Sequence, residues 1–273
     1  MHTASTDRTA LVTASTEGIG FATARLLAEE GARVWVHGRG GASLDRAVTA
    51  LRRAVPSARV DGVAADLAAD DGVRVLTTAV PEVDILVNGY ADTHPKPLAA
   101  VTDAEWTAAL RNNVAVTAML TRHYFERMLA LGWGRIVFIA SDLALRPLPV
   151  MVPYAAGKMA QLTLMRALAE EAAGTAVTVN AVLPGFTRTE RTEGFLRPLA
   201  ASHGMGFEAF MDAYFNDPAF PWRDEVGFGA SLVRRLLEPE EVACLVTFLC
   251  SARASGITGA SLRCDGGTTA TAL

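Results

Sequence analysis

The chain has 273 residues, enough for a sizeable core, and we expect a single domain over residues 1–273. Apolar residues make up 51% of it, charged residues 20%, and the net charge is −4. This balance predicts a globular protein and gives no electrostatic reason to bind nucleic acid or an anionic membrane. No apolar stretch approaches the roughly 20 residues that cross a bilayer, and the amino terminus lacks a secretory signal pattern, so we expect a cytoplasmic protein.

Cysteine and histidine spacing gives no sign of a metal site. Cys244, Cys250 and Cys264 lack C-x-x-C spacing, and we expect them to be buried, reduced thiols. The five histidines are scattered, without partners at ligand spacing. We therefore expect no bound metal.

Short, continuously apolar runs alternate with helical patterns along the chain. Continuous apolar runs are typical of parallel strands that helices cover on both faces. The expected strands are 9–14, 33–37, 59–64, 84–88, 135–140, 177–183 and 260–263. The expected helices are 18–30, 44–54, 70–79, 103–131, 153–173 and 239–251. This order predicts an α/β fold: one doubly wound (Rossmann) domain with a seven-stranded parallel sheet and helices on both faces.

Residues 186–230 interrupt this alternation. They hold nine of the 19 aromatic residues, together with several prolines and glycines, and form an insertion between two strands. One interpretation is an oligomer contact or a small separate core. The other, which we favour while expecting some rings to be structural, is an aromatic-rich lid over a pocket at the carboxyl edge of the sheet.

The first strand leads into TASTEGIG (residues 13–20) and then into a helix. A glycine-bearing turn at a helix amino terminus offers free N–H groups and a positive dipole end to a phosphate. Such turns are common, and the position of this one after the first strand is what favours a dinucleotide site.

The strongest pattern is Tyr154-Ala-Ala-Gly-Lys158. Residues four apart share one face of a helix. A nearby ammonium favours the phenolate and lowers a phenol pKa from its usual value of ~10. Ser141 lies thirteen residues earlier, at the end of an apolar strand. Two unrelated surface residues would be the alternative, but the order of these motifs makes chance a poor explanation.

From residue 9 to 267 these motifs resemble the short-chain dehydrogenase/reductase family, in particular members labelled oxoacyl-carrier-protein reductase-like. The family turn TGxxxGxG is matched at Gly18 and Gly20, with Ala14 in place of its first glycine. Because a β-carbon at positive φ costs ~1–2 kcal/mol, we expect Ala14 to have a negative φ or the turn to be rearranged. LVNGYA (residues 86–91) replaces the family's LVNNAG, which predicts a locally altered loop.

The resemblance implies a catalytic set of Asn113, Ser141, Tyr154 and Lys158. Ser141 and Tyr154 would hold the carbonyl oxygen, and Tyr154 would supply the proton. Lys158 would lower the phenol pKa and bind the nicotinamide ribose, and the carbonyl of Asn113 would hold a relay water.

The resemblance also implies a nicotinamide dinucleotide as cofactor. Gly38 stands where an NAD-selective carboxylate would lie and Arg39 follows it, which favours NADP(H) and leaves NAD(H) possible. Glu17 stands against that preference. The expected cofactor contacts are Thr13, Ser15, Thr16, Gly18, Ile19, Gly20, Arg39, Asp66, Leu67, Asn88, Tyr154, Lys158, Pro184, Gly185, Thr187 and Thr189.

The function expected from these patterns is hydride transfer between nicotinamide and a small to medium, apolar carbonyl compound or alcohol. Candidate substrate contacts are Asp92, His94, Asp142, Met151, Phe186 and Phe195. A lyase or isomerase with a redox-silent cofactor stays open because of the altered loop and Asp142. A non-catalytic dinucleotide-binding regulator is less favoured, since a sensor does not need all four catalytic residues. The family also implies a homo-oligomer, either a tetramer or a dimer.

Overall fold

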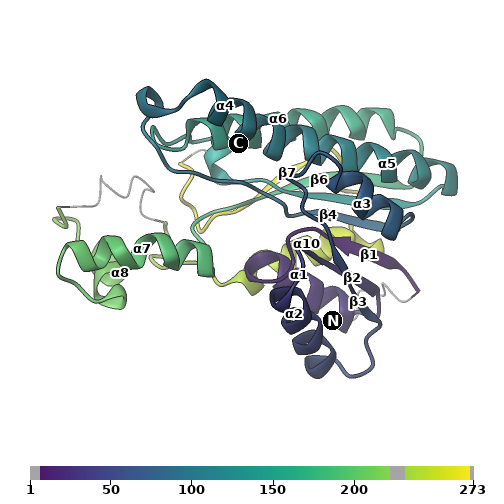
Figure 1. Cartoon of the computed structure of the whole chain (residues 1–273), viewed down its shortest axis with the longest axis horizontal. Helices are drawn as coiled ribbons and strands as arrows, with labels where there is room; N and C mark the ends of the chain where they lie inside the picture. The colour runs from purple at the N-terminus through teal and green to yellow at the C-terminus, as the bar shows by residue number, and fades with distance from the viewer. Residues whose placement is uncertain (1–6, 222–230, 271–273) are drawn as a thin grey trace.

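The seven apolar runs of the sequence form seven strands of one parallel sheet (Figure 1). The computed structural model describes residues 7–221 and 231–270. The strand order is β3-β2-β1-β4-β5-β6-β7, and every neighbouring pair is parallel. The strands are β1 (Thr9–Val12), β2 (Arg33–Gly38), β3 (Val60–Ala64), β4 (Ile85–Asn88), β5 (Gly134–Ile139), β6 (Val177–Pro184) and β7 (Ser261–Cys264). The predicted fold class is confirmed.

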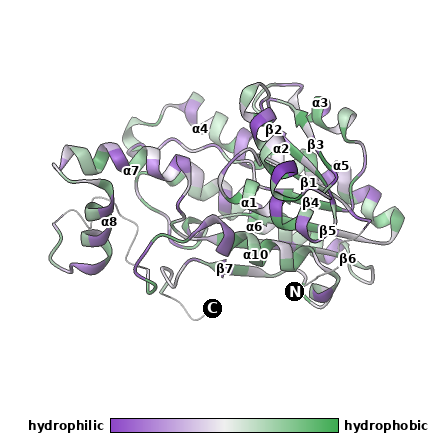
Figure 2. Ribbon diagram, turned by 90° about the horizontal axis from the view of Figure 1, so that it is seen from below, coloured by the Kyte–Doolittle hydropathy of each residue, from purple (hydrophilic) through white to green (hydrophobic). Residues whose placement is uncertain are grey.

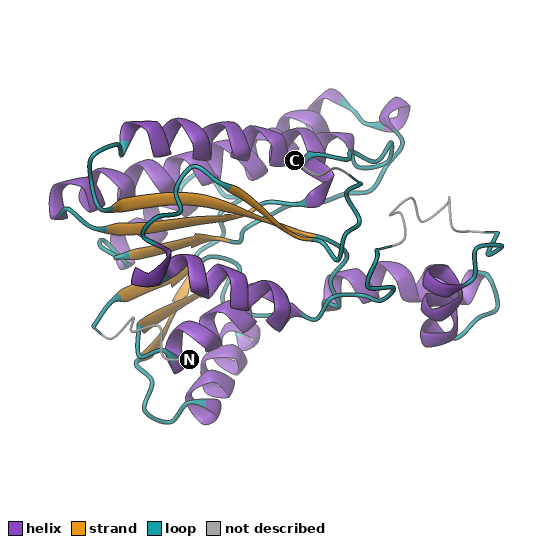
Figure 3. Ribbon diagram, turned by 180° about the vertical axis from the view of Figure 1, so that it is seen from behind, coloured by secondary structure: helices purple, strands orange, loops and turns teal. Residues whose placement is uncertain are grey.

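Helices cover both faces of the sheet (Figures 1 and 3). One layer holds α1 (Gly18–Glu29), α2 (Ala42–Ala54) and α10 (Pro239–Cys250). The other holds α3 (Gly72–Ala79), α5 (Val116–Leu131) and α6 (Val152–Glu171). No helix in the described part of the chain is long and apolar enough to cross a membrane.

Neighbouring strand residues belong to opposite cores. Leu11, Ile136 and Phe138 pack against the layer of α3, α5 and α6, whereas Val12 and Val137 pack against α1, α2 and α10. All of these side chains are buried. Because the central strands are covered on both sides, their sequences are mostly apolar, as their colouring in Figure 2 shows.

The expected long helix over 103–131 is present, but a π-helical turn divides it into two α-helical parts. α4 (Asp103–Leu110) begins with a capping box between Thr102 and Glu105, and α5 ends at Gly132, which has a φ of 71°. Between them, residues Arg111–Ala115 form a π-helical turn. Inside this turn, Asn113 Nδ2 donates hydrogen bonds to Ala109 O and Asp92 O, both 2.9 Å away. Such π-turns are rare and occur frequently at functional sites.

Ala14 has a φ of 52°, which excludes the first of the two expected alternatives, a negative φ. His37 at the end of β2, outside the turn, stabilises this left-handed conformation. Ala14 N donates to Nδ1 of His37 at 3.0 Å, and the next amide, Ser15 N, donates to His37 O at 2.9 Å. These bonds offset the cost of the β-carbon at this position.

The aromatic-rich insertion contains α7 (Glu190–Ser202) and α8 (Phe207–Asn216), which project from the carboxyl edge of the sheet (Figures 1 and 3). Phe207, Phe210, Tyr214, Phe215 and Phe220 pack into a small core of their own, as the structural interpretation predicted. Trp222 and Phe228 lie outside the described residues.

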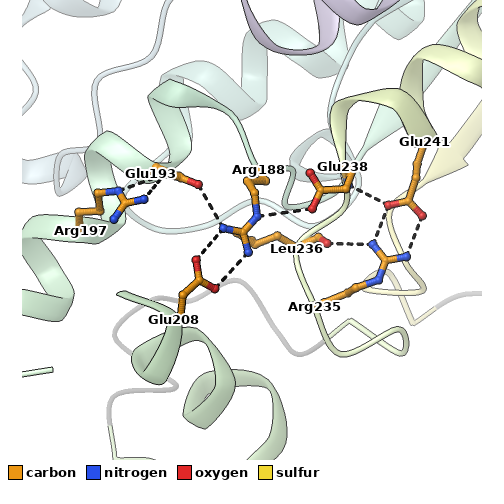
Figure 4. Close-up of polar contacts among 8 residues, drawn as sticks. All are labelled: Arg188, Glu193, Arg197, Glu208, Arg235, Leu236, Glu238 and Glu241. Carbon is orange, nitrogen blue, oxygen red and sulfur yellow. Dashed lines mark hydrogen bonds and ion pairs between the residues drawn. The ribbon is translucent and has the colours of Figure 1, made fainter. Parts of the chain in front are cut away.

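An ionic network joins this arm to the main body (Figure 4). The guanidinium of Arg188 contacts Glu208 of α8 at 2.9 Å, Glu193 of α7 at 3.2 Å and Glu238 before α10 at 3.5 Å. Arg235 pairs separately with Glu241 of α10 at 2.6 Å. Because these side chains are partly or largely exposed, each pair contributes little, but the network connects α7 and α8 to the residue before α10.

The sequence also led to expectations about the cysteines and about metal binding. Cys250 is buried and Cys264 is half-buried, but Cys244 is exposed on α10, so its predicted burial is wrong. The helix turns this position away from the sheet. Within residues 7–221 and 231–270, no group of three or more His, Cys, Asp or Glu side chains is arranged to hold a metal ion.

Replacing Ala14 with glycine tests the strain in the first turn. We expect Ala14→Gly to raise the free energy of unfolding by roughly 0.5–1 kcal/mol, since glycine removes the left-handed penalty but adds entropy to the unfolded chain. Ala50→Gly, at an exposed position of α2, should lower it by a similar amount. Urea unfolding measures both, and two changes of the same sign would contradict the assignment.

Candidate active site

A cleft of about 320 Å³ opens at the carboxyl edge of the sheet. Its walls come from the ends of β1, β4, β5 and β6, from the start of α6 and from α7. The strand order reverses between β1 and β4, and open α/β sheets bind their ligands at such a point.

Ser141, Tyr154 and Lys158 meet in this cleft, as predicted. Ser141 follows β5 and begins a short 3-10 turn over Asp142–Ala144, where its Oγ accepts a hydrogen bond from Leu143 N at 3.1 Å. Tyr154 and Lys158 lie on the same face of α6, with Lys158 Nζ 5.6 Å from the centre of the Tyr154 ring. Ser141 lies close enough to the phenol of Tyr154 to lower its pKa.

Lys158 is a buried cation held by neutral acceptors. Its Nζ donates to Ile139 O at 2.7 Å and to Gln161 Oε1 at 3.2 Å. Burial lowers the pKa of Lys158 to about 7, and the charge of Arg191 acts in the same direction. The ammonium is therefore close to titration at neutral pH.

The expectation that Lys158 lowers the phenol pKa of Tyr154 is wrong for this structure. Burial raises the pKa of Tyr154 to about 12, outweighing the nearby Ser141 and the charge of Arg191, which lower it. The physical reason is that the phenol is desolvated while the ammonium points to Ile139 and Gln161. Tyr154 is neutral at physiological pH.

Asn113 lies behind the cleft and does not line it. Its backbone carbonyl accepts a hydrogen bond of 2.6 Å from Gln161 Nε2, so a side chain makes the link to Lys158 that we expected a water to make. Gln161 is a functional candidate that the sequence analysis missed. The sequence pattern that could have indicated Gln161 is a polar residue one helical turn after Lys158, on the apolar face of the predicted helix.

The amino end of α1 fits the phosphates of a dinucleotide. Gly18, Ile19 and Gly20 line the cleft, and the side chain of the preceding Glu17 does not cap the helix, so its first N–H groups face the opening. A β-carbon on Gly20 would lie 2.3 Å from Ala14 O, and Gly18 has a φ of 55°. Only bare backbone fits this cradle, and it is suited to an anion.

The predicted cofactor contacts divide into two groups. Those that line the cleft are Gly18, Ile19, Gly20, Tyr154, Lys158, Pro184, Gly185, Thr187 and Thr189. Those outside its lining are Thr13, Ser15, Thr16, Arg39, Asp66, Leu67 and Asn88. Arg39 and Asp66 are exposed where β2 and β3 end, on the extension of the same edge.

Four side chains of the second group make contacts within the protein. Thr13 Oγ1 accepts from Gly89 N at 2.9 Å, which fixes the altered loop after β4, and Ser15 Oγ donates to Val12 O at 2.6 Å. Leu67 is packed in the core. The side chain of Asn88 turns away from the cleft because its Nδ2 donates to Thr121 Oγ1 of α5 at 3.0 Å.

His37 was missed by the sequence analysis, although a polar residue at the end of an apolar strand was visible. Because Ala14 N donates to its Nδ1, the ring proton lies on Nε2 and is donated to Ala65 O at 3.1 Å. Burial lowers the pKa of His37 to about 4, so the ring stays neutral. His37 thus ties the phosphate turn to the loop that carries Asp66.

Four of the six predicted substrate contacts line the cleft: Asp142, Met151, Phe186 and Phe195. The side chains of Asp92 and His94 are not part of that lining. The Asp92 carboxylate accepts a hydrogen bond from Asn112 Nδ2 and contacts His94 Nε2, both at 2.9 Å. The side chain of His94 is 82% exposed. Their neighbours Ala91 and Thr93 line the cleft instead.

Arg191 is a further cleft residue that the sequence analysis missed. From α7 its Nη1 donates to Ala91 O and Thr93 Oγ1, each at 3.3 Å. Its charge acts on Tyr154, Lys158 and Glu17. The first turn of α7 therefore crosses the cleft to the loop after β4.

Comparison with known proteins agrees with this geometry. The family description "short chain dehydrogenase" matches residues 8–198, and "Enoyl-(Acyl carrier protein) reductase" matches residues 223–269. The uncharacterized oxidoreductase YvaG of Bacillus subtilis is 40% identical over 260 residues, covering 95% of both chains. Dehydrogenase/reductase SDR family member 4 of Bos taurus is 37% identical over 266 residues, 96% of this chain and 87% of the relative.

Among solved structures, L-sorbose reductase from Gluconobacter frateurii, complexed with NADPH and L-sorbose, superposes with a TM-score of 0.89 at 28% identity. The match covers 99% of this chain and 100% of that one. Sequence and structure agree over nearly the whole length, and the chain belongs to the short-chain dehydrogenase/reductase family of NAD(P)-dependent oxidoreductases.

Proposed function

We propose that this protein is an NADP(H)-dependent reductase that transfers hydride to the carbonyl carbon of a small to medium substrate, with Tyr154 as the acid. The observation that carries the proposal is the convergence of Ser141, Tyr154 and Lys158 in one cleft with the uncapped amino end of α1. When bound, the nicotinamide dinucleotide supplies the hydride.

The chain's own residues hold the reacting oxygen and provide its proton. The hydroxyls of Ser141 and Tyr154 bind the carbonyl oxygen, where negative charge develops. A phenol with a pKa of about 12 is fully protonated at neutral pH and ready to donate, which suits the reducing direction. Ile139 O and Gln161 hold the ammonium of Lys158 at the cleft, where we propose that it binds the nicotinamide ribose.

The preference for NADP(H) rests on the end of β2. Gly38 offers no carboxylate to repel a 2′-phosphate, and the exposed guanidinium of Arg39 follows it. Glu17 opposes this preference less than its charge suggests. Burial, together with the nearby carboxyl of Glu190, raises the pKa of Glu17. The presence of NADPH in the related L-sorbose reductase supports the same choice.

The pocket and the arm support a mostly apolar substrate. Met151, Phe186 and Phe195 contribute apolar walls, and α7 closes one side through Arg191. We propose that α7 and α8 act as the cover of this cleft. A nicotinamide absorbance assay over a panel of carbonyl compounds tests the function; turnover without any absorbance change would indicate a lyase or isomerase instead.

Tyr154→Phe removes the proposed acid while keeping the ring. We expect kcat to fall by about 10²–10⁴-fold, the usual contribution of a positioned acid, with dinucleotide affinity largely intact. Tyr124→Phe is the matched control, since it removes a buried hydroxyl that bonds Val80 O far from the cleft. If Tyr154→Phe keeps more than a few per cent of the wild-type activity, the mechanism is refuted.

Gln161 should set the pH range in which Lys158 is charged. The protonated amine is present below its pKa, so Gln161→Leu, which removes an acceptor, should move the alkaline limb of the kcat/KM profile to lower pH. Gln161→Glu places an anion at the same point and should move that limb to higher pH. Profiles that stay fixed, or that shift in the same direction, would show that Gln161 has only a packing role.

Arg39→Ala tests cofactor choice. We expect NADPH binding to weaken by roughly 1.5–3 kcal/mol, the scale of a charged hydrogen bond, and NADH binding to change little. Arg53→Ala, at an exposed position of α2, is the control for a general loss of positive charge. Calorimetric titration gives all the affinities, and equal losses for both dinucleotides would exclude Arg39 from selecting the 2′-phosphate.

A further inference from the structure

Asp142 is a buried carboxylate directly beside the hydroxyl that we propose holds the reacting oxygen. Its side chain lines the cleft together with Ser141 and Tyr154, and the residue is only 6% exposed. Ser141 Oγ donates a hydrogen bond to Asp142 Oδ1 over 3.1 Å. Burial raises the pKa of Asp142 to about 6, so the group is mainly a carboxylate at neutral pH.

The charges that face Asp142 do not neutralise it. Asp265, from the turn after β7, raises its pKa, and Arg146, four residues further along the chain, lowers it. Asp142 in turn raises the pKa of Tyr154. Across residues 7–221 and 231–270, no ion pair joins Asp142 to a basic side chain. A buried carboxylate without a paired cation depends on hydrogen-bond donors for its stability.

This carboxylate is unfavourable for the reduction of a plain ketone. During hydride transfer, negative charge develops on the oxygen held by Ser141 and Tyr154, and an anion beside Ser141 opposes it. The carboxylate also competes for the hydroxyl proton of Ser141. A substrate that brings its own donor to Asp142 would satisfy the carboxylate and release Ser141 toward the carbonyl oxygen.

The geometry specifies where that donor lies on the substrate. Ser141 Oγ and Asp142 Oδ1 are separated by one hydrogen-bond length, so their ligands are neighbouring oxygens. A hydroxyl on the carbon next to a carbonyl meets this condition. An ammonium at the same carbon is less favoured, because Lys158 and Arg191 place two cationic side chains in the same cleft.

We propose that Asp142 is the specificity-determining residue of this site and that it binds a hydroxyl group on the carbon adjacent to the reacting carbonyl. The preferred substrates are then α-hydroxy ketones, and the products are 1,2-diols. The proposal rests on the reductase function proposed above. Thr93 and Thr192, which also line the cleft, can serve further hydroxyl groups of such substrates.

A matched pair of substrates tests the proposal: 1-hydroxy-2-butanone and 2-butanone, each reduced with NADPH. The wild-type protein should show a kcat/KM for the hydroxy ketone that is roughly ten- to hundredfold higher, the scale of one charged hydrogen bond. Asp142→Ala should reduce that ratio by about tenfold or more, and Asp142→Asn, which keeps an acceptor oxygen, should reduce it less. Thermal unfolding and NADPH titration of each variant show whether it is folded and binds cofactor.

The outcomes separate this inference from the reductase function. If the wild-type protein reduces none of the carbonyl compounds tested with NADPH, the proposed function itself fails. If it reduces other carbonyls but does not prefer the hydroxy ketone, the specificity proposal alone is overturned. Equal losses for both ketones in Asp142→Ala would also overturn it, because Asp142 would then only position Ser141. A higher kcat/KM for aminoacetone than for hydroxyacetone would overturn the proposal by showing that Asp142 prefers an ammonium group to a hydroxyl group.

Discussion

The burial of one ammonium group, that of Lys158, determines how several elements meet at the active site. A buried cation requires acceptors, and Lys158 finds them in Ile139 O at the end of β5 and in Gln161 of α6. Gln161 donates to Asn113 O, and Asn113 in turn holds the backbone of Asp92 through its side chain. A continuous line of hydrogen bonds therefore runs from the reacting centre through the π-helical turn to the loop that lines the cleft. Removing any member of this line would displace both the lysine and a wall of the pocket.

The electrostatic state of the cleft follows from desolvation more than from ion pairing. Burial is the largest influence on Tyr154, Lys158 and Asp142, and it moves each toward its neutral form. Lys158 and Arg191 are not paired with Asp142, so charges of both signs face the space where a substrate and a cofactor bind. Such a site favours ligands that supply anionic and donor groups at these points, even where the rest of the ligand is apolar. The phosphates of a dinucleotide and a substrate hydroxyl meet these two requirements.

The sequence predicted the sheet well because a parallel strand that is buried on both faces must be apolar throughout. It also predicted which residues meet, since the carboxyl ends of parallel strands share one edge and Tyr154 and Lys158 share a helix face. The sequence did not predict which hydrogen-bond partner a polar side chain would have when several were within reach. Asn88 turned to Thr121, Asp92 was satisfied by Asn112, and His37 bonded the amide of Ala14. The positive φ of Ala14 and the π-turn around Asn113 depend on such tertiary bonds, which leave no periodic signal in the chain.

The arm formed by α7 and α8 has a stability of its own, which limits how the cleft can change shape. Its buried rings pack against one another, and Arg188 links both helices to the start of α10. Across the cleft, Arg191 donates two long hydrogen bonds to the loop after β4. Neither bond involves the rings that form the core of the arm. A substrate that enters between α7 and the loop after β4 can therefore displace the Arg191 bonds and leave the core of the arm intact.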